Sequence, residues 1–151
     1  MALPLKNDSV DLFISSSVIE HLPDPEQAVS ELFRTIKPDG LVYAEIPFIG
    51  AYHMAPHDYQ RYTISGIESL FKRHGFILVE KGICSGPVTA LVLLLQHAIV
   101  EAIPWGPLQY IVRLILTWIL HPLKYLDYIF GQSQWGVCLA CNFFFLGRKP
   151  N

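Results

Sequence analysis

Residues 10–47 read VDLFISSSVIEHLPDPEQAVSELFRTIKPDGLVYAEIP, and this stretch decides the fold. It begins with a mostly apolar run over residues 10–15, which is typical of a strand covered on both faces. A helix start follows, with Asp24 in the N-cap position, Pro25 at the first helical position and Gln27 at capping-box spacing. The helix is predicted to bury one apolar face, made of Ala28, Val29, Leu32, Phe33 and Ile36.

Residues 37–40, KPDG, are predicted to end this helix, because they combine a cation near the helix end with two helix breakers. A second strand is predicted over residues 41–46. Strand, helix and strand within about 37 residues predict a right-handed βαβ unit, and therefore a parallel pair of strands. The expected fold class is α/β.

A second helix is expected to begin after Thr63 or Ser65 and to end at Gly75. Its apolar face is predicted to consist of Ile67, Leu70 and Phe71. A third strand is predicted over residues 76–80, and a fourth over residues 137–146.

Composition narrows the classes of function. The 151 residues amount to about one domain. The net charge is -2, from 11 basic and 13 acidic residues, and no basic run suggests nucleic acid as a partner. The first ten residues contain no apolar segment of the kind found in signal peptides. A cytoplasmic protein is expected, either in solution or attached to or inserted in the inner face of a membrane.

The chain has three cysteines, Cys84, Cys138 and Cys141. A small, odd number of cysteines argues against a disulfide framework and fits a reducing compartment. Cys138 and Cys141 have C-x-x-C spacing, but a zinc ribbon needs a second such pair. On a strand, residues three apart point to opposite faces. We therefore expect neither a metal nor a redox role for this pair.

The chain becomes strongly apolar after residue 83. Of its 24 charged residues, only four lie between Cys84 and Gly147: Glu101, Arg113, Lys124 and Asp127. Helices that are apolar almost all round are predicted over residues 87–103 and 108–120, with a continuation over residues 123–130. The expected organisation is a core over residues 1–83, an apolar helical insert over residues 84–136 and a closing antiparallel strand within residues 137–151.

Three interpretations of the insert remain open. Neither long helix reaches the ~20 uninterrupted apolar residues that a spanning helix needs. The helices are expected to lie in a membrane interface, with aromatic side chains at headgroup level: Trp105, Tyr110, Trp118 and Tyr125. The alternatives are a short membrane hairpin and a lid buried against the core.

Three motifs then occur in order: LPLxxDSVDL from residue 3, SSSVIEHLPDP from residue 15 and LxRxxKPxG from residue 32. Together they resemble the second half of the type 11 family of class I S-adenosylmethionine-dependent methyltransferases. The resemblance implies a partial Rossmann-like methyltransferase sheet, with the apolar helical insertion placed before its last strand. It also implies S-adenosylmethionine as cofactor and methyl transfer to an acceptor, which the insert suggests is small or lipid-linked.

The sequence lacks three features of that family: the glycine-rich turn, the acidic residue that holds the ribose hydroxyls, and the residue before Leu3 that contacts adenine. This chain would supply only one side of the ligand-binding crevice that lies beyond the carboxyl ends of the strands. A truncated or split methyltransferase is therefore expected, completed by a complementary chain or by a homodimer. The alternative is a non-catalytic fragment that binds a partner chain or a membrane through its apolar helices.

By resemblance, the turn formed by Ser15, Ser16 and Ser17 contacts the methionine part of the cofactor, and Glu20 joins it. The plain alternative is a polar turn between a strand and a loop. Glu20-His21 is also a hallmark of the family, but Ser17 stands where a metal site would need another ligand, so no metal is predicted. These two side chains are then expected to brace the loop, with His21 a candidate general base.

The loop over residues 49–63 follows the second strand at the edge where acceptors bind in this fold. It carries His53, His57, Asp58, Tyr59, Arg61 and Tyr62. Methyl transfer needs an aligned donor and acceptor and, for an oxygen acceptor, removal of a proton. His57 or Asp58 could remove that proton, and Arg61 could bind an anionic acceptor. The alternative is that Asp58 and Arg61 pair with each other and shape the loop.

Overall fold

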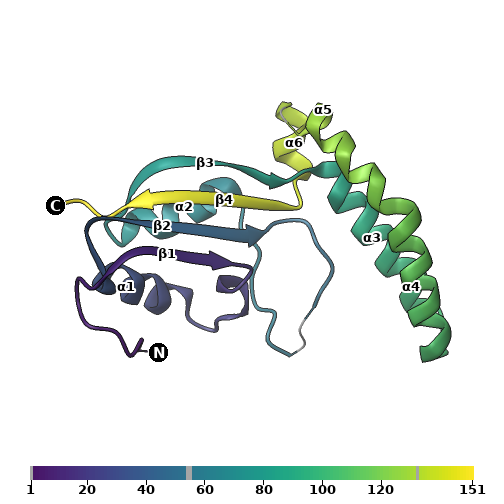
Figure 1. Cartoon of the computed structure of the whole chain (residues 1–151), viewed down its shortest axis with the longest axis horizontal. Helices are drawn as coiled ribbons and strands as arrows, with labels where there is room; N and C mark the ends of the chain where they lie inside the picture. Colours follow the sequence, from purple (N-terminus) through teal and green to yellow (C-terminus); the bar gives the residue numbers. More distant parts are fainter. Residues whose placement is uncertain (1, 54–55, 132) are drawn as a thin grey trace. The chain divides into compact units, whose positions relative to one another are not determined.

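The computed structural model describes residues 2–53, 56–131 and 133–151. The chain divides into two compact units. Unit 1 comprises residues 1–48, 52–84 and 142–151, and unit 2 comprises residues 49–51 and 85–141. Figure 1 shows a sheet with helices in the first and a group of helices in the second.

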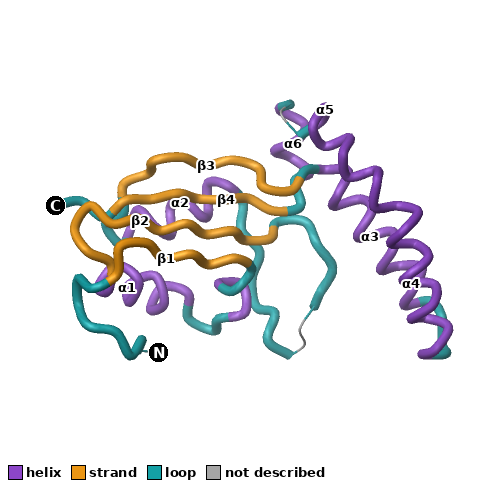
Figure 2. Tube along the Cα trace, in the orientation of Figure 1, coloured by secondary structure: helices purple, strands orange, loops and turns teal. Residues whose placement is uncertain are grey.

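Unit 1 is built on a four-stranded mixed sheet with the order β1-β2-β4-β3 (Figure 2). The strands are β1 (Val10–Ser16), β2 (Ile36–Pro47), β3 (Ile77–Ser85) and β4 (Asn142–Arg148). β1 and β2 pair in parallel, and β4 pairs with β2 antiparallel. The expected α/β fold class and the parallel first pair are confirmed.

Two amphipathic helices pack on one face of this sheet, α1 (Pro25–Thr35) and α2 (Ile64–Arg73). The Asp24 side chain accepts a hydrogen bond from the Gln27 N–H at 2.9 Å, so the predicted helix start is confirmed. Thr63, not Ser65, caps α2. The predicted face of α2 is buried, and the Phe71 ring stacks on Phe145 of β4 with 4.6 Å between centroids.

The opposite face of the sheet is apolar but open. No helix among the described residues of unit 1 covers it (Figure 2). Its exposed side chains include Leu12 and Ile14 of β1. A buried sheet normally has both faces covered, so this face is a candidate contact surface.

The predicted boundary between α1 and β2 was wrong. α1 ends at Thr35, and Ile36 already begins β2 as a fully buried strand residue. Residues 37–40 bulge from the strand, because the register passes from Val10↔Ile36 to Leu12↔Leu41. Asp39 adopts a positive φ of 61°, and its N–H donates to the Lys149 carbonyl at 2.9 Å. Contacts with the C-terminal segment therefore extend the strand through the helix-breaking sequence.

The predicted fourth strand was also wrong in its first five residues. The helix α6 (Gln134–Leu139) occupies this part of the chain, and β4 begins only at Asn142. The Ser133 hydroxyl caps α6 by accepting from the Gly136 N–H at 3.1 Å. Cys138 thus lies on a helix and Cys141 just before a strand, so the two cysteines do not share a strand as expected.

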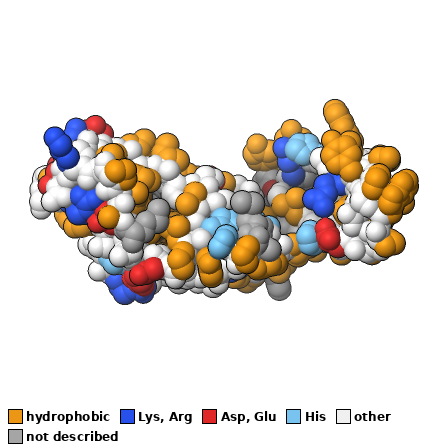
Figure 3. Space-filling view, turned by 90° about the horizontal axis from the view of Figure 1, so that it is seen from below, with side chains coloured by type: hydrophobic (Ala, Val, Ile, Leu, Met, Phe, Trp, Pro, Cys, Tyr) orange, Lys and Arg blue, Asp and Glu red, His pale blue; other side chains and the backbone are white. Residues whose placement is uncertain are grey.

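Unit 2 consists of short helices: α3 (Pro87–Glu101), α4 (Gly106–Leu120), η2 (His121–Leu126), α5 (Asp127–Phe130) and α6. The two longer helices that the sequence predicted, over residues 87–103 and 108–120, are confirmed as α3 and α4. Among the described residues, none of the helices has the length and apolarity needed to cross a membrane. Figure 3 shows apolar side chains over much of the visible surface of this unit.

Candidate functional site

The carboxyl ends of β1 and β2 lie at one edge of the sheet, because the two strands are parallel. Ser15 is buried opposite Ala44, and the Ser16 hydroxyl donates to Glu45 Oε2 at 2.6 Å. Ser17 has a φ of 52° and donates its N–H to the Glu45 carbonyl at 3.0 Å. A serine in the left-handed region is uncommon, and such strained residues cluster at functional sites.

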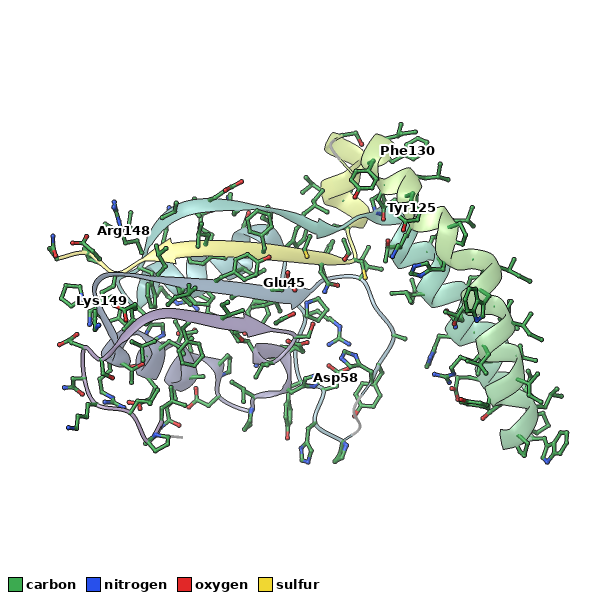
Figure 4. The ribbon with its side chains drawn as sticks, viewed as in Figure 1. Glu45, Asp58, Tyr125, Phe130, Arg148 and Lys149 are labelled. Carbon is green, nitrogen blue, oxygen red and sulfur yellow. The ribbon has the colours of Figure 1, made fainter. Side chains whose placement is uncertain are left out.

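Glu45 of β2, labelled in Figure 4, accepts hydrogen bonds from three side chains. Besides Ser16, the Tyr43 hydroxyl donates to its carboxylate at 2.7 Å and the Cys84 thiol at 3.0 Å. These hydrogen bonds, with that from Ser16 the strongest, lower the pKa of Glu45. Sequence reasoning missed Glu45, although a lone acid inside an apolar strand was a usable signal.

The short helix η1 (Ile19–His21) carries a buried carboxylate. The Glu20 side chain is 0% exposed, and neither oxygen has a hydrogen-bond partner among the described residues. Burial raises the pKa of Glu20. His21 Nε2 lies 3.7 Å from Glu20 Oε1, and the ring of His53 meets that of His21 edge-on at 4.8 Å. The Glu20 side chain therefore faces two histidines instead of an open cofactor surface.

The loop after β2 is closed by an ion pair. Both terminal nitrogens of Arg61 contact the Asp58 carboxylate, one at 2.6 Å, and the His53 N–H donates to the same group at 2.9 Å. Arg61 lowers the pKa of Asp58 and is itself held protonated, with a raised pKa. Asp58 and Arg61 thus pair with each other, which was the alternative to catalytic roles for these two residues.

Main-chain contacts fasten this loop to η1. The Tyr59 N–H donates to the Glu20 carbonyl at 2.9 Å, and His21 Nδ1 lies 2.6 Å from the His57 carbonyl. The His57 side chain is exposed, with Nδ1 at 3.0 Å from the Tyr59 hydroxyl. Of the four residues predicted to be catalytic, three therefore lie in or against this loop as part of its framework and are at most partly exposed, whereas His57 is exposed.

Glu20, His21 and His53 are suited to hold a metal ion. Each offers one ligand atom, and these atoms lie within 4.8 Å of one another. Sequence reasoning placed His53 in the loop but did not select it. No spacing rule connects His53 to Glu20, because the two residues are brought together only by the fold.

A cavity of about 120 Å³ lies beside the serine turn. Its walls are mostly apolar, and Glu31 and Ser15 are the polar residues among them: Leu3, Phe13, Ser15, Val18, Ile19, Leu22, Ala28, Glu31 and Leu32. Pockets for small molecules usually measure roughly 300 Å³ or more. The cavity can therefore accept only part of a cofactor-sized ligand.

Residues 1–44 match a sequence family described as a methyltransferase domain. An uncharacterised methyltransferase of Mycobacterium bovis is similar to this chain, with 57% identity over 42 residues. Those residues make up 28% of this chain and 16% of that protein. The chain thus spans a small part of the length of the curated relative that it matches.

Solved structures share the architecture. The chain is similar to phosphoethanolamine N-methyltransferase 2 of Haemonchus contortus in complex with S-adenosyl-L-methionine, with a TM-score of 0.58 and 21% identity over 97% of this chain and 35% of that one. It is also similar to the [4+2]-cyclase SpnF, with a TM-score of 0.57 and 14% identity over 99% of this chain and 53% of that one. Residues 1–44 thus match the methyltransferase domain family, and the chain shares the fold of solved S-adenosylmethionine-dependent methyltransferases.

Proposed function

We propose that unit 1 forms one wall of an S-adenosylmethionine-dependent methyltransferase site. The observation that carries this proposal is the meeting of two features at one sheet edge. The turn of Ser15, Ser16 and Ser17 ends β1, and the loop after β2 begins at the same edge. Ligands of open α/β sheets bind beyond the carboxyl ends of the strands.

The serine turn and the cavity beside it would hold part of the cofactor, which supplies a methyl group on a sulfonium centre. Val18 and Leu22 line that cavity and would exclude water from the apolar part of the ligand. The Glu20 side chain is buried, so in this conformation it does not take part. A second wall would come from a complementary chain or from a second copy of this one.

Among the predicted catalytic residues, His57 fits proton removal best. The pKa of Asp58 is lowered by Arg61, so its carboxylate is a weak base. Arg61 is committed to Asp58 and is therefore a positioning residue for the loop. The exposed His57 imidazole can accept a proton from a hydroxyl or amine acceptor, which we propose to be small or lipid-linked.

Calorimetric titration of S-adenosylmethionine into the 151-residue chain in mild detergent tests this proposal. We expect micromolar binding to the wild type and at least tenfold weaker binding to Val18→Trp, which fills the mouth of the cavity. Leu12→Trp is the matched control, because Leu12 is exposed to a similar extent, 49% against 47%, but lies on the open face. Absence of binding to a folded sample, or equal loss in both variants, would contradict the proposal.

A second function is favoured by the positions of the polar and apolar side chains of unit 2. Polar side chains of α3 and α4 bond to each other: Gln96 donates to the Thr117 hydroxyl at 2.7 Å, and Arg113 pairs with Glu101 at 3.4 Å. Large apolar side chains point outward instead, with Trp118 82% exposed. We infer that these helices bind a lipid surface without spanning it, as amphiphilic interfacial helices do.

Sedimentation with liposomes that contain anionic phospholipid tests this second function. Serine substitution of Trp118 and Ile119 together should lower the bound fraction severalfold, because both side chains are exposed. Serine substitution of Leu12 and Ile14 on the open sheet face is the matched control. Binding that is lost equally in both double variants, or lost in neither, argues against a lipid-facing role for α4.

A further inference from the structure

We propose that Glu20, His21 and His53 form a binding site for one divalent transition-metal ion. The three side chains come from two segments, η1 and the loop after β2, and their ligand atoms lie within 4.8 Å of one another. The site lies wholly within unit 1. Its test needs no methyl donor, so the proposal stands or falls independently of methyl transfer.

The first argument is the state of the Glu20 carboxylate. It is completely buried, and neither oxygen accepts a hydrogen bond within the described parts of the chain. A buried carboxylate without a partner lowers the stability of the fold. The nearby guanidinium of Arg61 is held by both oxygens of Asp58. A bound cation would supply the missing charge and the missing ligand contacts together.

The second argument is the orientation of His21. Its Nδ1 lies 2.6 Å from the His57 carbonyl, which can only accept a hydrogen bond, so Nδ1 carries the proton. Nε2 then presents a lone pair toward Glu20 Oε1 at 3.7 Å. Two lone pairs facing each other repel unless a proton or a metal cation lies between them. Ligands about 2.0–2.2 Å from an ion are themselves about 3–4 Å apart, which fits this spacing.

The third argument is the support around His53. The Asp58–Arg61 pair lies against its ring, with His53 Nδ1 3.5 Å from Asp58 Oδ2 and 3.3 Å from an Arg61 nitrogen. The His53 N–H also donates to Asp58. Metal-binding histidines are commonly oriented by a carboxylate or carbonyl, and the Asp58 carboxylate acts here through the His53 main-chain N–H. The His57 carbonyl would thus be the outer partner of the His21 imidazole, and the Asp58–Arg61 pair would hold His53 in position.

Two imidazoles and one carboxylate favour zinc or another late first-row ion over magnesium or calcium, which prefer oxygen ligands alone. Three protein ligands leave at least one position for water or a further ligand. The sequence predicted no metal because Ser17 contributes no ligand beside Glu20 and His21. The fold supplies the third ligand from the loop after β2 instead.

Titration of the EDTA-treated full chain with Co²⁺, followed by visible absorption, tests the site, and competition with Zn²⁺ gives the affinity. We expect one ion per chain, and at least about 30-fold weaker binding in Glu20→Gln and in His53→Asn. His121→Asn is the matched control, since His121 is an exposed histidine of unit 2 that should leave binding unchanged. Binding that survives in His53→Asn, or a folded wild type that binds only at millimolar concentration, would overturn the proposal.

Thermal unfolding separates metal binding from a purely structural role. Zn²⁺ should raise the melting temperature of the wild type and leave that of Glu20→Gln unchanged. In EDTA, Glu20→Gln should be at least as stable as the wild type, because it removes a buried carboxylate that has no partner. A Zn²⁺ shift of equal size in both proteins would refute the assignment of Glu20 as a ligand.

Discussion

Arg61 grips both carboxylate oxygens of Asp58, three residues before it, and the Asp58 side chain is only 1% exposed. A bidentate pair of this kind fixes orientation as well as distance. Because Asp58 also receives the His53 N–H, the pair sets the path of the loop after β2. It therefore determines where His53 and His57 lie, even though neither Asp58 nor Arg61 is free to react.

Arg61→Met should destabilise the protein by about 2 kcal/mol at pH 7, because Asp58 would be left buried with only the His53 N–H as donor. The folded pKa of Asp58 is lowered, so its contribution is complete above the unfolded value of about 3.9 and is lost as the pH falls below it. The difference between wild type and variant should thus shrink below about pH 4. Urea unfolding at several pH values measures both effects.

Lys72→Met is the control for Arg61→Met. Lys72 also pairs with an acid, Glu68, four residues before it in α2, but Lys72 is exposed to solvent. Exposed pairs contribute little to stability, so this variant should unfold almost as the wild type does. Equal destabilisation in both variants would mean that the Asp58 pair has no special role in the loop.

Phe145→Ala should lower the free energy of unfolding by about 3–4 kcal/mol, because the ring is fully buried and stacks on Phe71. Phe144→Ala is a matched control on the adjacent residue, whose ring lies on the other face of β4 against Tyr43. Its cost should stay below about 2 kcal/mol, since that face is only partly covered. Comparable losses at both positions would contradict the assignment of the covered face.

Periodicity predicted the elements of unit 1 well because each helix shows one apolar face. Ile67, Leu70 and Phe71 are buried as the helical spacing requires. The errors lie where distant residues decide the outcome. Residues 37–40 contain helix breakers, yet they belong to β2 because Asp39 and Gly40 exchange main-chain hydrogen bonds with Lys149 of the C-terminal segment. A pattern read over neighbouring residues cannot contain that information.

The site was predictable only in part for the same reason. Ser15, Ser16 and Ser17 could be placed at the sheet edge, because a parallel strand has to end there. The pairing of Asp58 with Arg61 was one of two open alternatives. The approach of His53 to Glu20 and the collection of donors around Glu45 depend on how the loop and β3 fold back, so they emerge only in three dimensions.

Asp127→Ala should destabilise unit 2 by about 1–2 kcal/mol. The Asp127 carboxylate accepts from the main-chain N–H groups of Val88 and Thr89, at 2.8 and 3.0 Å, and thus caps α3 from another segment of the chain. Glu101→Gln, which alters only an exposed pair, should have little effect. Helix content by circular dichroism during urea unfolding gives both values, and an unchanged midpoint in Asp127→Ala would exclude the capping role.

Ile14→Thr should reduce self-association without loss of stability. Ile14 is 64% exposed on the open sheet face, and threonine keeps the branched side chain that strands favour. The free energy of unfolding should therefore stay within about 0.5 kcal/mol of the wild type. Val42→Thr is the contrasting variant, because Val42 is fully buried and a hydroxyl there lacks solvent. Sedimentation velocity should show less association in Ile14→Thr, and an unchanged distribution would mean that the open face is not the surface through which copies meet.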